Sequence, residues 1–263
     1  MFFTKMHGLG NDYLYVYGEV PDNIEQLSIK LSERHFGAGS DGMIYISPSD
    51  IADFKMRIFN ADGSEAKMCG NGIRCVGKYV YDKGYTDKKE IRVETLSGIK
   101  TLTLDVASGK VKSVSVDMGK SVVSDDVTLD VDGACVTLTP VSVGNPHAVI
   151  FVDDINTAPL TTLGPKIERH TAFPDGVNVE FVQRLSDREL RMRVWERGSG
   201  VTMACGTGAC ASVSAAVKHS LCRANEPVSV HLDGGTLKIA VDRDCNVTMT
   251  GPAEFVYEGE TVE

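Results

Sequence analysis

Two cysteines of this chain lie in nearly the same glycine-rich setting. Cys69 is part of the segment MCGNGIRC, and Cys205 is part of ACGTGAC. They are 205 − 69 = 136 residues apart in a chain of 263 residues, so the setting recurs after about half of the chain. Two matched thiols that face a small molecule from opposite sides could invert a stereocentre. One would remove a proton from one face while the other delivers a proton to the other face.

The glycines that follow each cysteine predict a tight turn into a helix. Glycine lets the backbone turn sharply and approach a ligand closely. The first amides of a helix and the positive end of its dipole bind a carboxylate, and the same field lowers the pKa of a thiol. We therefore expect Cys69 and Cys205 to be acidified and to lie beside a bound anion.

Other interpretations of the cysteines remain open, although the duplication favours catalysis. A free cysteine is commonly a small buried hydrophobe, and we expect this for Cys75 and Cys210, about one turn further into each helix. The spacings C-x5-C and C-x4-C differ from the C-x2-C pair of structural zinc sites. A redox dithiol would need a C-x-x-C motif, which this sequence lacks. We expect no metal and no cofactor.

Polar side chains that could bind an amino acid recur in short turns. The asparagines of this kind are Asn11, Asn60, Asn71, Asn145 and Asn178. An amide both donates and accepts hydrogen bonds, so it suits a carboxylate and an ammonium group, but asparagine is also a common turn former. Arg197 could pair with a carboxylate through two hydrogen bonds. His147 could tune a thiol or be a core histidine with its hydrogen bonds satisfied.

Length and composition indicate a two-domain protein that acts on a small molecule. A length of 263 residues allows one large domain or two of ordinary size, and the duplicated cysteine setting favours two. A net charge of −9 argues against a nucleic-acid groove or an anionic membrane surface. No apolar run approaches the ~20 residues of a membrane helix. Seven cysteines, an odd number, without a secretion signal favour reduced thiols in the cytoplasm.

Hydrophobic periodicity predicts strands and helices in two halves that follow the same plan. In the first half we expect a helix capped by Asn23 and running to about Glu33, a helix after Cys69 that stops near Gly84, and strands at 2–6, 13–17, 43–46, 54–59, 90–95, 99–106 and 111–117. In the second half we expect helices at 160–170 and 208–219, and strands at 136–143, 148–152, 177–183, 190–195, 228–232, 236–241 and 246–250. The small residues of 208–217 favour a helix that is packed closely on all sides.

Several long motifs of this chain resemble those of the diaminopimelate epimerase family. They are KMHGLGNDY (5–13), FNADGSEAKMCGNGIRC (59–75), VGNPHAV (143–149), GVNVEF (176–181), WERGSG (195–200), ACGTGACAS (204–212) and GPAEFVYEGE (251–260). The resemblance spans the whole length. It implies a cofactor-independent enzyme that converts LL- to meso-diaminopimelate in lysine and cell-wall precursor synthesis.

The resemblance also implies a role for individual residues. Cys69 and Cys205 are the expected acid/base pair, and His147 and Glu196 are expected to support catalysis. The expected substrate contacts are Asn11, Asn60, Gly70, Asn71, Asn145, Asn178, Glu196, Arg197, Gly206 and Thr207. Some members of the family carry Gln where this chain has Gly42, so a polar contact near the distal end of the substrate is expected to be missing.

The fold that the resemblance implies is α+β, with two similar halves. Each half is expected to be a curled, barrel-like mixed sheet around a central helix, with the active site in the cleft between the halves. We expect residues 1–117 to form the first half, with a C-terminal strand at 251–263 returning to it, and residues 118–250 to form the second. Tyr257 matches the family's dimer-interface tyrosine, so a homodimer is expected.

Three alternative functions remain open. A proline or hydroxyproline racemase or epimerase would use the same pair of thiols. A non-catalytic module that binds an amino acid or a metal belongs to another class, as does a thiol oxidoreductase. Exchange of an α-proton with solvent distinguishes the epimerases from a binding module, which gives no exchange, and dithiol-dependent electron transfer would identify an oxidoreductase.

Overall fold

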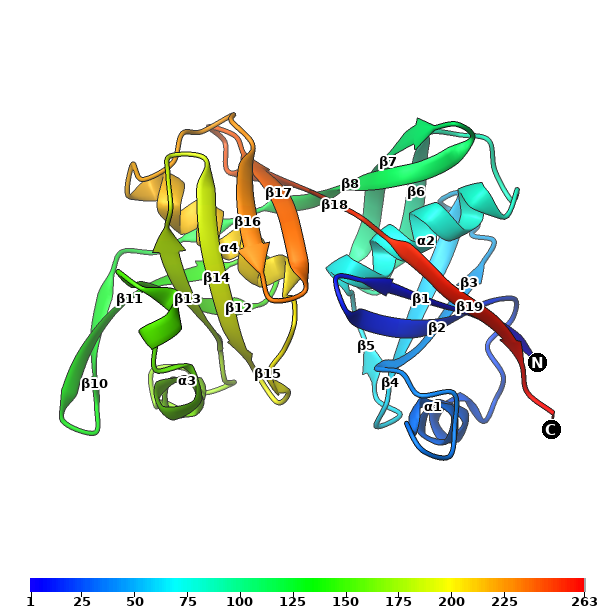
Figure 1. Cartoon of the computed structure of the whole chain (residues 1–263), viewed down its shortest axis with the longest axis horizontal. Coiled ribbons are helices and arrows are strands. Elements are labelled where there is room, and N and C mark those ends of the chain that lie inside the picture. The colour runs from blue at the N-terminus through cyan, green and yellow to red at the C-terminus, as the bar shows by residue number, and fades with distance from the viewer. Residues whose placement is uncertain (263) are drawn as a thin grey trace. The chain divides into compact units, whose positions relative to one another are not determined.

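A computed structural model describes residues 1–262 and confirms the mixed α+β class (Figure 1). The chain divides into two compact units. Unit 1 comprises Met1–Val116 together with the segment from Gly251 onward, and unit 2 comprises Asp117–Thr250. Among the described residues, no helix is both long and apolar enough to cross a membrane.

Unit 1 contains two α-helices and most of the N-terminal strands. Its elements are β1 (Phe2–Gly8), β2 (Asn11–Tyr17), α1 (Ile24–Ser32), β3 (Gly42–Ser47), β4 (Phe54–Asn60), β5 (Glu65–Ala66), α2 (Gly70–Asp82), β6 (Glu90–Thr95), β7 (Gly98–Ala107), the first part of β8 (Lys110–Lys120) and β19 (Glu254–Glu260). The C-terminal strand β19 pairs antiparallel with β1, which lies beside it in Figure 1.

Unit 2 contains the other two α-helices. Its elements are β9 (Val122–Val123), β10 (Val127–Val131), β11 (Ala134–Ser142), β12 (Pro146–Phe151), the short 3-10 helix η1 (Ile155–Thr157), α3 (Leu160–Glu168), β13 (Asn178–Arg184), β14 (Glu189–Glu196), β15 (Gly200–Val201), α4 (Gly206–Lys218), β16 (Val228–Leu232), β17 (Gly235–Val241) and most of β18 (Asn246–Gly251).

The strands of the two units pair in the same pattern. In unit 1, β2 pairs parallel with β3, β3 antiparallel with β4, and β4 parallel with β6. In unit 2, β12 pairs parallel with β13, β13 antiparallel with β14, and β14 parallel with β16. A parallel pair needs a crossover connection, usually a helix. Here α1 and α3 lie in the first crossovers, and α2 and α4 lie in the second, immediately after the cysteine turns.

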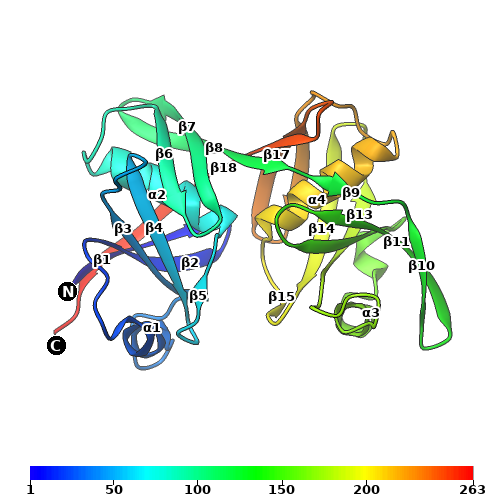
Figure 2. The same ribbon diagram turned by 180° about the vertical axis from the view of Figure 1, so that it is seen from behind.

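The two crossover helices that follow the cysteines lie in the cores of their units. In α2, every residue from Gly70 to Val80 is buried, and the helix packs against β1, β2 and β7. Helix α4 packs against β9, β11, β12, β13, β14, β16 and β17, and Figure 2 shows it beside β9, β13 and β14. The small side chains that the sequence places in this helix, such as Ala209, Ala211 and Ala215, are fully buried. A larger side chain there would overpack the core, typically at a cost of about 1–3 kcal/mol.

Three local predictions differ from the structure. Helix α1 follows Asn23, but the Asn23 side chain makes no capping hydrogen bond. Helix α4 begins at Gly206, two residues before the predicted Gly208, because Cys205 rather than a later residue caps it. The short strands β5, β9, β10 and β15 were not expected; three of them have only two residues. A strand of two residues is too short to show the alternation from which strands are predicted.

Candidate active site

Each of the two matched cysteines caps the buried helix that follows it. Cys69 precedes α2 in an extended conformation, and its Sγ accepts a hydrogen bond from the Gly72 amide at 3.3 Å. Cys205 precedes α4 in the same conformation, and its Sγ accepts from the Gly208 amide, also at 3.3 Å. The other amides of a first helical turn point out of the helix end, where they attract an anion. Each unit therefore presents one thiol beside an anion-attracting helix terminus.

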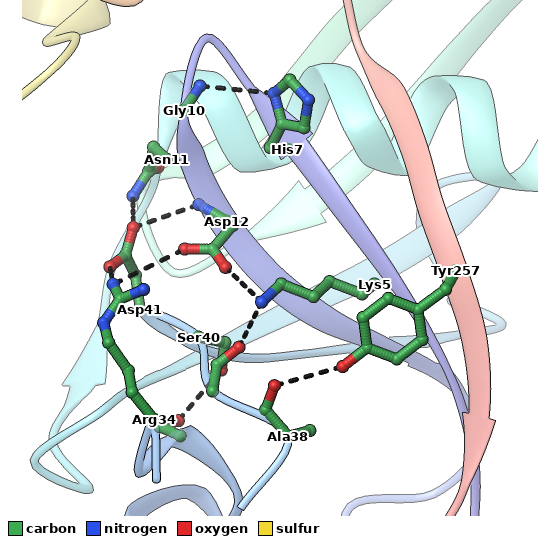
Figure 3. Close-up of polar contacts among 12 residues, drawn as sticks. Lys5, His7, Gly10, Asn11, Asp12, Arg34, Ala38, Ser40, Asp41 and Tyr257 are labelled. Carbon is green, nitrogen blue, oxygen red and sulfur yellow. Dashed lines mark hydrogen bonds and ion pairs between the residues drawn. The ribbon is translucent and has the colours of Figure 1, made fainter.

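In unit 1, the Cys69 thiol has a defined hydrogen-bond partner. Cys69 Sγ donates to Asn11 Oδ1 at 3.3 Å. The opposite side of the same amide donates from Nδ2 to Asp41 Oδ2 at 2.8 Å, as Figure 3 shows. Because Asp41 accepts hydrogen bonds when ionised, it fixes which way the Asn11 amide faces. The amide of Asp12 and the guanidinium of Arg34 also donate to this carboxylate, which holds it in place.

A buried arginine holds the first turn of α2. Arg74 has no exposed surface, and its guanidinium donates to the carbonyl of Gly70 and to Asn71 Oδ1, each at 3.0 Å. Its Nε donates to the carbonyl of Pro252, just before β19. The Asn71 side chain is therefore anchored by a charged group that is itself tied to the C-terminal segment.

Unit 2 surrounds its thiol differently. Cys205 is buried, and Thr207 Oγ1 lies 3.6 Å from its Sγ. Burial raises the pKa of the Cys205 thiol well above its usual range, and the charges of Glu196 and Glu180 add to that effect. The expectation that both thiols are acidified is therefore wrong for Cys205. The hydrogen bonds from Thr207 and Gly208 lower this pKa, but desolvation and the two carboxylates outweigh them.

Glu196 lies at the end of β14 and faces Cys205. Burial raises the pKa of its carboxyl group, and hydrogen bonds from Thr202 and Cys205 partly offset this. Glu196 Oε1 also accepts a short hydrogen bond from the Thr202 hydroxyl. The carboxylate predicted to support catalysis is thus in contact with the second cysteine.

His147 is fully buried and its ring is held at both nitrogens. Its Nδ1 lies 2.6 Å from Glu180 Oε1, and its Nε2 lies 3.1 Å from Asn145 Oδ1. Asn145 Nδ2 in turn donates to Thr207 Oγ1 at 3.3 Å. The structure therefore joins two predicted site residues, His147 and Asn145, to the first turn of α4. Glu180, which links to them, was not predicted.

The remaining predicted residues have partners of their own. Asn60 donates to Ser64 Oγ at 3.1 Å. Asn178 is buried between backbone groups: its Nδ2 donates to the Pro146 carbonyl at 3.1 Å, and its Oδ1 accepts from the Arg197 amide at 3.0 Å. Asn178 thereby fixes the turn that carries Arg197, whose exposed guanidinium donates to the Asp175 carbonyl.

Two further predictions concern positions outside the cysteine turns. Tyr257 on β19 is 41% exposed, and its hydroxyl donates to the Ala38 carbonyl at 3.1 Å (Figure 3). At Gly42, a Cβ atom would lie 2.1 Å from the Phe59 carbonyl oxygen. A glutamine side chain at this position would therefore require the backbone to move, so the close approach of β4 accounts for the glycine.

Solved structures similar to this chain share its fold at low sequence identity. A Bacillus anthracis phenazine biosynthesis protein of the PhzF family has a TM-score of 0.80 at 15% identity, covering 100% of this chain and 99% of that one. A hydroxyproline epimerase from Agrobacterium vitis has a TM-score of 0.72 at 17% identity, covering 99% and 90%. At this identity the likeness supports the fold alone.

Curated relatives are much closer in sequence. The diaminopimelate epimerase of Acetivibrio thermocellus is 51% identical, covering 99% of this chain and 98% of the relative. That of Phocaeicola vulgatus is 53% identical, covering 98% and 97%. The family described as diaminopimelate epimerase matches residues 3–124 and 139–256. The chain therefore belongs to the diaminopimelate epimerase family.

Proposed function

We propose that this protein epimerises LL-diaminopimelate to meso-diaminopimelate, without a cofactor, in the cytoplasmic synthesis of lysine and of peptidoglycan precursors. The observation that carries the proposal is the pair of cysteines that cap equivalent helices, each accepting a glycine amide at 3.3 Å, in a chain about half identical to diaminopimelate epimerases along its whole length. A binding module would have no need of two matched thiols.

The proposed mechanism uses one thiolate and one thiol. Cys205 holds its proton because it is buried beside two carboxylates, so it is suited to deliver a proton. In the proposed reactive form, half-buried Cys69 has given up the proton that it donates to Asn11 Oδ1 in this structure, and the resulting thiolate removes the α-proton from the opposite face. Positioned proton transfer supplies typically ~10²–10⁴ in rate. The first-turn amides of α2 and α4 would supply more, because they stabilise the charge that develops on the α-carboxylate.

The substrate contacts follow from the same arrangement. The backbone of Gly70 and Asn71 in unit 1, and of Gly206 and Thr207 in unit 2, would hold the reacting carboxylate at the helix ends. The other substrate contacts that we propose are Asn11, Asn60, Asn145, Asn178, Glu196 and Arg197. His147 and Glu196 would support the protonation of Cys205.

The fold and the assembly complete the proposal. The repeated strand pairing supports two similar halves, 1–117 with the C-terminal strand and 118–250, each a curled sheet around α2 or α4. Each half would contribute one thiol to the reaction. We also propose a homodimer with Tyr257 at its interface, since part of this ring is exposed. Light scattering of the wild type and of Tyr257→Ala tests it, and a monomeric wild type would contradict it.

The activity is tested by incubating the protein with LL-diaminopimelate and separating the stereoisomers of the product. We expect meso-diaminopimelate to form, and Cys69→Ala or Cys205→Ala to abolish its formation. The matched controls are Cys135→Ala and Cys245→Ala, which remove exposed thiols and should retain activity. L-proline and hydroxyproline in parallel assays test the nearest alternative function. Conversion of either imino acid, but not of LL-diaminopimelate, would overturn the proposal.

A further inference from the structure

A fully buried carboxylate in unit 2 occupies a position where unit 1 has a hydrocarbon side chain. A Cβ atom built on Gly208 would lie 2.7 Å from Glu180 Oε1. A Cβ atom built on Gly72, its counterpart in α2, would lie 2.7 Å from Ile44 Cδ1. The side chain beneath the first turn of each helix is therefore glutamate in one unit and isoleucine in the other.

The strand register shows that these two positions are equivalent. Glu180 lies on β13 opposite Val149, which follows His147 by two residues. Ile44 lies on β3 opposite Tyr15, in the parallel pair that corresponds to β12 and β13. Because the fold accommodates isoleucine at this place in unit 1, it does not require a carboxylate there. Burying a charge is costly unless it is paired, so Glu180 requires a reason specific to unit 2.

The contacts of Glu180 indicate that reason. One oxygen, Oε1, lies 2.6 Å from His147 Nδ1, with both side chains fully buried. The other, Oε2, is buried and has no hydrogen-bond partner among the described residues. Glu180 Oε1 and Cys205 Sγ both lie within 3.2 Å of the Cβ position of Gly208. The carboxylate thus contacts the histidine on one side and the helix turn that holds the thiol on the other.

His147 connects Glu180 to Thr207, which lies beside the thiol. Asn145 directs its Nδ2 to Thr207, so its Oδ1 faces His147 Nε2 as an acceptor. Nε2 must therefore carry a proton, while Nδ1 shares one with Glu180. A chain of contacts runs from Glu180 through His147 and Asn145 to Thr207, beside Cys205.

We propose that Glu180 is a positioning residue of the Cys205 site. Its buried carboxylate fixes the protonation and orientation of the His147 ring, and it places a negative charge that keeps the Cys205 proton on sulfur. The proposal deepens the epimerase function proposed above and rests on it. The other groups that face this thiol are Glu196 from β14, and Thr207 and the Gly208 amide from α4. His147 faces Glu180 from β12. Glu180 acts through these neighbours and is not proposed to contact the substrate.

The proposal predicts that Glu180→Gln releases the Cys205 proton at lower pH. Glutamine keeps the size of the side chain, and its amide can donate to Nδ1 of a neutral His147. A negative charge near a thiol disfavours the thiolate and so raises the pKa of the thiol. Loss of the His147 proton would offset part of this. We therefore expect the midpoint for alkylation of Cys205 by iodoacetamide to fall by about half a unit or more.

Alkylation is followed by peptide mass spectrometry across a pH series, which needs no enzymatic activity. Cys69, in the same sample, serves as the internal reference, and its midpoint should stay unchanged. Glu189→Gln, an exposed carboxylate on the neighbouring strand β14, is the matched control and should leave the Cys205 midpoint unchanged. An unchanged or higher midpoint in Glu180→Gln, with the melting temperature preserved, would overturn the proposal.

Kinetics distinguish positioning from a structural role. Glu180→Gln should lower kcat at least about tenfold, change KM little, and move the basic limb of the pH profile to lower pH. In a His147→Gln background, Glu180→Gln should lower kcat much less than it does in the wild type, since both residues act through the same series of contacts. Full additivity of the two substitutions would overturn the proposal. Failure of the wild type to epimerise diaminopimelate would refute the proposed function but leave the alkylation result as a separate test.

Discussion

A single methyl group at Gly208 would test how tightly the Cys205 site is built. In Gly208→Ala the new Cβ would lie 2.7 Å from Glu180 Oε1, whereas ordinary contact begins at 3.4 Å. The oxygen would have to retreat by 3.4 − 2.7 = 0.7 Å, and this movement would disturb its 2.6 Å contact with His147. Overpacking costs about 1–3 kcal/mol, and alanine returns up to about 1 kcal/mol of helix preference. The protein should therefore still fold.

The expected effect of Gly208→Ala is on the reaction. A displacement of this size in the groups around the thiol should lower kcat about 10- to 100-fold, since a shift of about 1 Å can cost a factor of 10². Steady-state kinetics with LL-diaminopimelate measure it. Gly72→Ala is the matched substitution in unit 1, where the new atom meets a flexible methyl end, Ile44 Cδ1, and we expect a smaller loss. In a Glu180→Ala background, Gly208→Ala should lower kcat little further, because the carboxylate that the new methyl group meets is gone. A Gly208→Ala protein with wild-type kcat would refute this reasoning.

Three further predictions concern the two thiols and their neighbours. Iodoacetamide at neutral pH should modify Cys69 before Cys205, because Cys205 is buried and its pKa is raised; peptide mass spectrometry showing Cys205 modified first would contradict the assigned environments. Asp41→Asn should lower kcat about tenfold, because the Asn11 amide loses a charge-assisted hydrogen bond of about 1.5–3 kcal/mol that amide pairing only partly replaces; unchanged kinetics would remove Asp41 from the site. The raised pKa of Cys205 means that the folded protein keeps this proton while the unfolded chain releases it near the ordinary thiol pKa of about 8.5, so the contribution of this thiol to stability is present below that pH and is lost as pH rises above it. Urea unfolding above about pH 8.5 measures how the free energy of unfolding falls as pH rises. In Cys205→Ala this fall should be less steep than in the wild type, by at most about 1.4 kcal/mol per pH unit. An equally steep fall in the variant would contradict the prediction.

The sequence predicts the elements that carry the cysteines better than it predicts the chemistry around them. Glycine after each cysteine and apolar residues at helical spacing identify α2 and α4, because these signals are local. The prediction that Asn23 caps α1 is wrong for its side chain, which forms no capping hydrogen bond. The pKa of Cys205 was predicted in the wrong direction, because it depends first on the burial of the thiol and then on carboxylates from β14 and β13, whose strands the cysteine motif does not reveal.

Glu180 shows what a sequence pattern can and cannot indicate. It lies two residues after Asn178, so strand alternation places both side chains on one face. That face is buried, and a carboxylate on it is the signal that could have been used. Its partner, His147, is 33 residues away, and only the parallel pairing of β12 with β13 brings the two together. The same holds for Asp41, which precedes β3 and whose role depends on the position of Asn11 on β2.

The central claim is that two thiols act from opposite faces of one α-carbon, and the fate of the α-proton tests it most directly. LL-diaminopimelate is incubated with the wild-type protein in D₂O, and both stereoisomers are analysed at early conversion. The account predicts meso product that carries solvent deuterium at one α-carbon, while the remaining LL substrate stays essentially unlabelled, because the proton removed by one thiol is not the one that the other delivers. Meso product that retains the substrate proton, or equal deuterium in both isomers from the start, would contradict it.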